Sequence, residues 1–301
     1  TLLDARPPEL FGDAGPLSPL TEALAELARE RGSLGLHPGL VVDSAEATGW
    51  LSASRLAAPG SQVLSGLLAA TAERCSAPSH VAAAFVWKSY GFWTAMPVAL
   101  GWALNRRVPL PSIHDTIVRV LDEAPNVVLA ARAMTTAVLA GDPYAGTPGT
   151  VTVPDEAALG TLVRRVLLEE HHAAMIAALG RLTRVSNRGL WGSVAEALTY
   201  GIRFAATATP RLRPTSPTTA PSAAPTTAAS PTAATTAASP ADPMGTEMRN
   251  LLARVGGPVT GLVEVHDTAE GVDVRRRTCC FAITVPGLGV CDSCCVPRDR
   301  S

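Results

Sequence analysis

The cysteines of this chain are concentrated near its C-terminus. Five of the six lie between positions 279 and 295: the adjacent pair Cys279 and Cys280, then, after ten residues, Cys291, Cys294 and Cys295. Two groups of thiols joined by a short loop can supply four thiolate ligands to a metal centre. The spacing therefore predicts a four-thiolate site in this segment.

Three kinds of site fit such a cluster of thiols. A disulfide framework is typical of small secreted domains, whereas this chain has 301 residues and its first residues do not resemble a secretion signal. A structural zinc site would use Cys291 and Cys294, but zinc sites usually take their other ligands from a second spaced pair. An iron-sulfur cluster has no such spacing requirement. Adjacent side chains point to opposite faces of a strand, so Cys279 and Cys280 can converge only where the backbone bends.

The pattern Cys-Cys-x10-Cys-x2-Cys after a run of arginines resembles the C-terminal signature of the FhuF-like ferric-siderophore reductases. The resemblance implies a [2Fe-2S] cluster held by Cys279, Cys280, Cys291 and Cys294. Cys295 is a thiol that the family pattern lacks, and it can exchange with Cys294 as the fourth ligand.

Two further segments resemble the same family. The run Trp87-Lys88-Ser89-Tyr90, followed by Pro97, is similar to its central helix, and Arg188 with Leu190-Trp191-Gly192 is similar to its third recurring segment. The resemblance suggests that the ferric siderophore meets Lys88, Tyr90, Arg188 and Trp191. Packing is the other interpretation of Arg188 and Trp191, and the small residues Gly192, Ser193 and Ala195 predict close approach of another element.

The activity implied by the resemblance is one-electron reduction of siderophore-bound Fe(III) to Fe(II), which makes the chain an oxidoreductase of the cytoplasm. Ferric iron is a hard ion bound by hydroxamate or catecholate oxygens, so one added electron lowers its charge and weakens those bonds. The chain has no Gly-x-Gly-x-x-Gly after a strand, so an external ferredoxin or reductase should supply the electrons. A loose association with the inner membrane face is also expected.

Arg275, Arg276 and Arg277 directly precede the cysteines. Cations near an iron-sulfur centre favour its reduced form, so these residues are candidates for tuning the cluster. The alternative interpretation is a basic strip on the surface.

Composition limits the remaining possibilities. The chain has 47% hydrophobic and 17% charged residues, which indicates a globular protein with a sizeable core. Its formal net charge of -1 gives no electrostatic reason to expect nucleic-acid binding. We expect a helix-rich α+β fold, with a mainly helical body, small β elements and a C-terminal four-cysteine segment.

Local patterns predict the elements of the body. Helices are expected at about 20–31, 62–74, 154–182 and from 186, and short strands at 117–121 and 126–130, joined by a turn at 122–125. The apolar stretch 79–107 predicts a buried core helix kinked at Pro97, because Lys88 near its middle would cost about 2.5–3.5 kcal/mol in a membrane. His171 and His172 are adjacent, so one is expected in solvent and the other at the core edge.

Three segments are expected. Residues 1–207 form the helix-rich body, residues 208–243 are an Ala-, Pro-, Ser- and Thr-rich linker predicted to be disordered, and residues 244–301 bind the cluster and dock on the body. Within the last segment we expect a helix at 245–255, strands at 259–265 and 278–284, and a reversal at 285–289.

Two functions of other classes fit parts of the same pattern. The chain could be a non-catalytic iron-sulfur or zinc binding module that acts as a sensor. It could also be related to siderophore synthetases, although no phosphate-binding loop is evident.

Overall fold

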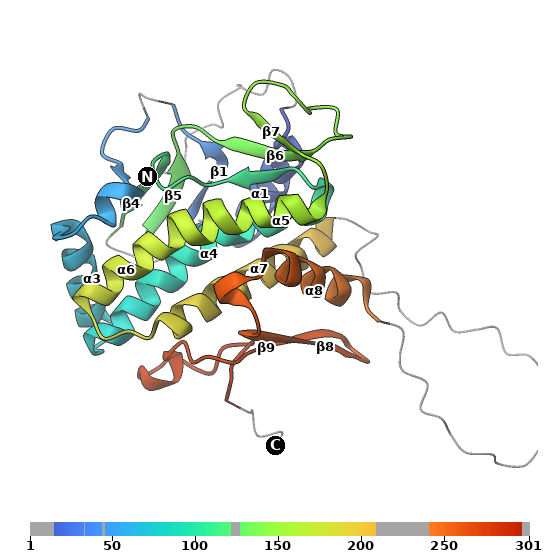
Figure 1. Cartoon of the computed structure of the whole chain (residues 1–301). Helices are drawn as coiled ribbons and strands as arrows, with labels where there is room; N and C mark the ends of the chain where they lie inside the picture. Colours follow the sequence, from blue (N-terminus) through green and yellow to red (C-terminus); the bar gives the residue numbers. More distant parts are fainter. Residues whose placement is uncertain (1–14, 33, 44–45, 122–126, 209–240, 297–301) are drawn as a thin grey trace, which may run out of the picture.

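A computed structural model describes residues 15–32, 34–43, 46–121, 127–208 and 241–296 (Figure 1). Within these residues the fold is helix-rich α+β, as predicted, with two small sheets on one side of a helical layer and a β-hairpin on the other (Figure 1). The helical layer consists of α1 (Ser18–Arg31), α2 (Ala53–Leu56), α3 (Gln62–Arg74), α4 (Ser79–Asn105), α5 (Glu156–Val163), a π-helix (Arg164–His172), α6 (Ala173–Leu182), α7 (Asn187–Ala208) and α8 (Pro243–Val255).

Helix α4 is the central element of the fold. It has 27 residues, is apolar on every side and is buried along most of its length, as expected of a helix enclosed by other elements. It continues through Pro97 and ends at Arg106, whose left-handed backbone (φ 62°) stops the helix. No helix within the described ranges has the length and apolarity needed to cross a membrane.

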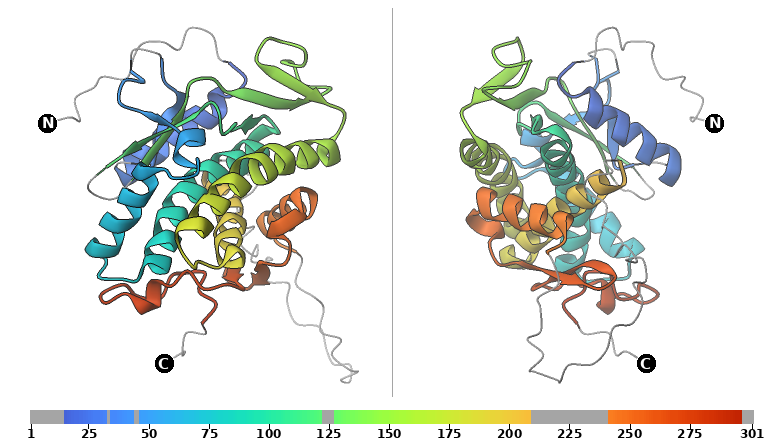
Figure 2. Two further views of the ribbon diagram at one scale, coloured as in Figure 1. Left: turned by 60° about the vertical axis from the view of Figure 1, so that its left-hand side comes forward. Right: turned by 90° about the vertical axis from the view of Figure 1, so that its right-hand side faces the viewer.

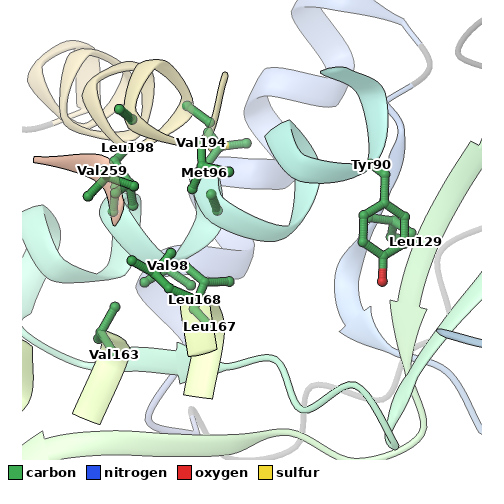
Figure 3. Packing of buried hydrophobic residues seen from close by; sticks show 14 of the residues in the cluster. Tyr90, Met96, Val98, Leu129, Val163, Leu167, Leu168, Val194, Leu198 and Val259 are labelled. Atoms are coloured by element: carbon green, nitrogen blue, oxygen red, sulfur yellow. The ribbon is translucent and has the colours of Figure 1, made fainter. Parts of the chain in front are cut away.

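Helix α7 packs along α4 and forms the main contact of the core. Figure 3 shows Met96 of α4 beside Val194 of α7, and Val98 of α4 beside Leu167 and Leu168 of the π-helix. Gly201 allows the two helices to approach, since a Cβ atom there would lie 2.5 Å from the Met96 carbonyl oxygen and 2.6 Å from the Ala99 Cβ atom. The α4–α7 contact thus forms the rigid base of the molecule.

The two sheets cover one face of the helices. One has the order β1-β5-β4-β2, from strands Leu36–Val41, Val127–Ala131, Thr116–Val120 and Leu51–Ser52, and the other has the order β3-β6-β7, from Val108–Leu110, Thr135–Leu139 and Thr150–Val153. The predicted strand pair is confirmed as the antiparallel pair β4–β5, with Arg119 opposite Val128. The turn expected at 122–125 lies outside the described residues.

The predicted helix at 154–182 exists, but its middle is a π-helix rather than an α-helix. The linker expected at 208–243 lies almost wholly outside the described residues, which resume at Ala241. Helix α8 then begins after Asp242, whose carboxylate accepts hydrogen bonds from the Met244 and Gly245 amides. Met248, Leu251 and Val255 of α8 belong to the same core as α4 and α7, so the segment after the linker packs as part of the body.

The C-terminal hairpin differs from the prediction. Its strands are β8 (Val263–Thr268) and β9 (Gly271–Arg276), and the strand expected at 278–284 is wrong. The ladder ends at Arg276, and Phe281 takes a left-handed conformation (φ 64°) that turns the chain into a short 3-10 helix at Ala282–Thr284. A strand cannot continue through such a turn, so the cysteine segment is irregular.

Gly201→Ala is expected to lower the free energy of unfolding by about 1–3 kcal/mol, because the added methyl group cannot fit between α7 and α4. Gly66→Ala is the matched control in α3, where nothing lies within 4 Å of the added atom. It should raise stability by up to about 1 kcal/mol through helix propensity. Chemical denaturation of both variants tests this, and equal effects would contradict the packing described.

Candidate functional site

The five clustered cysteines lie on two short irregular segments of the C-terminal region, which Figure 2 shows in red below the helices. The sulfur atoms of Cys280 and Cys291 are 3.7 Å apart, although the two residues are eleven positions apart in sequence. Burial and the neighbouring thiols of Cys279 and Cys294 raise the pKa of Cys295. Within the described part of the chain every cysteine is a free thiol. The fold therefore brings cysteines of the two sequence groups near one another, Cys280 to Cys291 and Cys279 to Cys295.

The first segment contains the backbone bend that the adjacent cysteines require. Phe281, the next residue, has a left-handed backbone, and its amide donates a hydrogen bond to the Cys279 sulfur at 3.2 Å. The ring of Phe281 packs edge-on against His80 of α4, with the ring centroids 5.5 Å apart. This contact fixes the bend against the start of the central helix.

The second segment is a tight turn. The Cys294 amide donates to the Cys291 carbonyl oxygen at 3.1 Å, and the Val296 amide donates to the Cys294 sulfur at 3.4 Å. Amide donors to sulfur stabilise thiolates and are common around iron-sulfur centres. Cys279 and Cys294 each accept one such bond, one from each segment.

A buried ion pair connects both segments to α7. Arg276 on β9 and Glu196 on α7 have side chains only 1% and 5% exposed, and the nitrogen and oxygen atoms lie 3.1 Å apart. The other oxygen of Glu196 accepts a hydrogen bond from the hydroxyl of Ser293, which lies between Cys291 and Cys294. The Arg276 amide donates to the Ser293 carbonyl oxygen at 2.8 Å. One carboxylate thus positions the strand before the first cysteines and the turn within the second group.

The guanidinium of Arg276 also contacts the first segment directly. It donates to the Thr278 hydroxyl and to the Gly189 carbonyl oxygen of α7, both at 3.2 Å. Thr278 packs directly against Gly192, where any larger residue would collide with it. This confirms the close approach predicted from the small residues of this helix.

Lys88 lies beside the second segment, although it is about 200 residues away in sequence. Burial and the neighbouring Cys280 thiol raise the pKa of Cys291 to about 12, and the positive charge of Lys88 acts in the opposite direction. Without a metal the thiol is therefore protonated at neutral pH, so metal binding here would release a proton.

The three arginines before the cysteines do not act as one positive group. Arg275 pairs with Asp273 at 2.9 Å and Arg277 with Glu264 at 3.3 Å, both at the surface, while Arg276 is buried against Glu196. Their charges are therefore largely offset by carboxylates. Lys88 is a further cation of the site, close enough to Cys291 to act on its pKa.

The residues expected to meet a substrate lie in different environments. Arg188 is exposed and Trp191 is half-buried near the start of α7. The prediction that Tyr90 meets the substrate is corrected, because Tyr90 lies in the core beside Leu129 (Figure 3) and is only 2% exposed. Its hydroxyl is hydrogen-bonded to His171, so it cannot face a ligand at the surface. The helical pattern of the sequence does not show that Tyr90 is buried while Lys88 reaches the cysteine segment, because α4 is enclosed on nearly every side.

The prediction for the two histidines is wrong, since both are fully buried. The π-helix widens the turn and directs both rings inward, where the Tyr90 hydroxyl contacts His171 Nε2 at 2.5 Å and the Thr94 hydroxyl contacts His172 Nε2 at 2.6 Å. His171 Nδ1 lies 2.7 Å from the Pro111 carbonyl oxygen, so Nδ1 carries the proton and Tyr90 donates to Nε2. Burial lowers the pKa of both residues, that of His171 to about 4.

The sulfur positions of Cys280 and Cys291 fit one tetrahedral metal ion held by thiolates, whether iron or zinc. A tetrahedral metal ion holds thiolate sulfur at about 2.3 Å, which places two thiolates of one ion about 3.8 Å apart. The 3.7 Å separation of the Cys280 and Cys291 sulfurs agrees with this value and is far longer than a disulfide bond. Among the described residues no three Cys, His, Asp or Glu side chains already surround one point.

Comparison with known proteins adds no assignment, since neither a family model nor a curated protein matches this chain. Glu196 and Ser293 are the residues of the site that sequence reasoning missed. Glu196 could have been identified from the sequence, because it is a single carboxylate within the apolar run Val194-Ala195-Glu196-Ala197-Leu198. A charge in such a position requires a buried partner.

Glu196→Gln should lower the free energy of unfolding by about 3–5 kcal/mol, because it leaves the buried Arg276 without its counterion. Glu264→Gln, which removes the partner of Arg277 at the surface, should change it by less than about 1 kcal/mol. Urea denaturation measures both, with the rate of thiol labelling as a second readout of the cysteine segments. Equal effects would show that Glu196 does not hold the site.

The buried histidines predict a dependence of stability on pH. Because the pKa of His171 falls from about 6.5 in the unfolded chain to about 4 in the fold, the unfolded chain takes up a proton in this range that the folded chain does not. Stability should therefore fall as the pH falls from about 6.5, by up to about 1.4 kcal/mol per pH unit for this residue. His171→Gln should reduce the slope between pH 6.5 and 5, whereas the exposed His266→Gln should not. An unchanged slope in His171→Gln would contradict the account.

Proposed function

We propose that this chain is a ferric-siderophore reductase of the FhuF-like family, holding a [2Fe-2S] cluster through Cys279, Cys280, Cys291 and Cys294. The single observation that best supports this is the 3.7 Å separation of the Cys280 and Cys291 sulfurs, the distance expected of two thiolates on one tetrahedral iron. The resemblance of the cysteine spacing to that family supplies the substrate class.

A two-iron centre requires two pairs of cysteines. Cys280 and Cys291 form one pair, and Cys279 with Cys294 forms the other in this proposal. Cys294 is preferred to Cys295 because its sulfur accepts an amide hydrogen bond and is half-buried, whereas Cys295 is exposed. The proximity of Cys295 to Cys279 makes it the natural substitute.

A bound [2Fe-2S] cluster exchanges one electron at a time. The chain's own residues hold and orient the thiolates: Glu196 connects Arg276 and Ser293, and Lys88 places a positive charge beside Cys291. That charge favours the more negative, reduced state. An external donor, a ferredoxin or a reductase, supplies the electron, and the siderophore-bound Fe(III) accepts it and becomes Fe(II). No proton transfer or nucleophile is required for this step.

Cys280→Ser and Cys291→Ser should each abolish iron binding and the visible absorption, because each removes half of the better-formed pair. Cys75→Ser should retain both, since Cys75 follows α3 far from the others in sequence. Iron analysis of anaerobically purified protein checks this. Full iron content in Cys291→Ser would exclude the proposed ligands, and iron loss in Cys295→Ser but not in Cys294→Ser would move the fourth ligand by one residue.

Stopped-flow reoxidation distinguishes a reductase from a sensor. Dithionite-reduced protein mixed anaerobically with ferric siderophore should be reoxidised with a rate that saturates, and a chelator should trap about one Fe(II) per cluster. Ferric citrate is the matched simple chelate. Reoxidation no faster with siderophores of several classes than with ferric citrate, and without saturation, would favour the sensor and exclude the reductase.

A further inference from the structure

A hollow of about 420 Å³ lies between the start of α4 and the end of α6. It is lined by Ser79 and His80, the first residues of α4, and by residues 180–184. Its volume is within the range of small-molecule sites. Figures 1 and 2 both show the cysteine segment beneath these helix ends.

The charged side chains that line this hollow are both positive. Arg181 and Arg184 belong to it, and no carboxylate does. Arg181 is oriented by a 2.9 Å hydrogen bond from its guanidinium to the Ala57 carbonyl oxygen, and Arg184 has no ion-pair partner within the described residues. The N-terminus of α4 has no side-chain cap, so the positive end of a 27-residue helix opens at the same place. All these features favour a negatively charged ligand.

The hollow adjoins the cysteine centre. His80 forms part of its wall, the ring of His80 packs against the ring of Phe281 with centroids 5.5 Å apart, and the Phe281 amide donates to the Cys279 sulfur at 3.2 Å. One aromatic contact therefore separates a ligand in the hollow from the residues around Cys279.

A second hollow, of about 320 Å³, lies on another side of the cysteine segment and has the opposite charge. Its lining includes Glu270, Asp273 and Asp292, with Arg203 as the cation. These carboxylates outnumber the single guanidinium even though Asp273 is also paired with Arg275, so this hollow favours an anion less than the first. Of the two hollows, the first therefore offers an anionic complex the more favourable place beside the cysteines.

We propose that the hollow lined by Arg181 and Arg184 binds ferric complexes with a net negative charge, such as tris-catecholates, in preference to neutral complexes. Three catecholate dianions around Fe(III) leave an excess of negative charge, whereas three hydroxamate monoanions leave the complex neutral. This choice of substrate rests on the proposed reductase function, and binding itself can be measured without it.

Gallium(III) complexes test the binding, because gallium replaces ferric iron in such complexes but accepts no electron. Quenching of the fluorescence of the five tryptophans, measured on the cluster-loaded protein, should show tighter binding of gallium tris-catecholate than of a neutral gallium trihydroxamate. The difference should shrink as salt is added. Arg184→Glu should weaken binding of the anionic complex by about tenfold or more, since it reverses one charge of the hollow.

Two control variants test whether the charge effect on binding belongs to the hollow lined by Arg181 and Arg184. Arg165→Glu changes an exposed arginine outside both hollows, and Arg203→Glu changes the cation of the second hollow. Both should leave binding of the anionic complex unchanged, provided that circular dichroism shows each variant folded. Equal affinity for neutral and anionic complexes, or weakening by Arg203→Glu instead of Arg184→Glu, would overturn the inference.

Experiments with the same complexes distinguish a failure of this inference from a failure of the proposed function. Release of Fe(II) from neutral but not from anionic ferric complexes would leave the reductase in place and exclude the basic hollow as its substrate site. Binding of gallium tris-catecholate that depends on Arg184, with no Fe(II) released from any ferric complex, would exclude the reductase and retain the anion site.

Discussion

The buried ion pair between Arg276 and Glu196 is the interaction on which the cysteine site depends. Two charges removed from water stabilise a fold only when they are paired and hydrogen-bonded, and here every partner belongs to the site. Arg276 also contacts Thr278, and Glu196 also accepts from Ser293. Because Glu196 lies on α7, which packs along α4, the rigid core of the protein dictates where the two cysteine segments meet.

This arrangement explains how an irregular segment can present thiols in a defined geometry. The residues from Thr278 to Cys295 contain no strand and only one short 3-10 helix, so regular hydrogen bonding does not hold them. Side-chain contacts to α7 and the packing of Phe281 on His80 take its place. Metal binding would add to this framework, since ligands already near their bound positions lose less conformational entropy.

Elements with local signals were predictable. The bounds of α3 match the predicted helix, and β4 and β5 pair where two short apolar runs separated by turn residues indicated strands. Local sequence patterns gave wrong predictions where contacts between distant parts of the chain determine the structure. The Thr278–Thr284 segment has the composition of a strand, but the left-handed Phe281 prevents one. Burial of both histidines depends on a π-helix that no local propensity indicates.

The clustering of thiols could be predicted from the sequence, and the residues that support it could not. Cysteine spacing identified the thiol cluster, because few other uses explain such a concentration, whereas Glu196 and Ser293 act through partners about 100 residues away in sequence. Lys88 was predicted as a contact for substrate, and its place beside Cys291 could not be foreseen without the fold.

The most direct test of the central claim is the metal and sulfide content of the anaerobically purified protein, compared with that of Glu196→Gln. The account predicts about two iron atoms and about two acid-labile sulfides per chain, with a red-brown colour, and a clear loss of both in the variant. One zinc ion per chain and no sulfide, or full iron content in a folded Glu196→Gln protein, would contradict it.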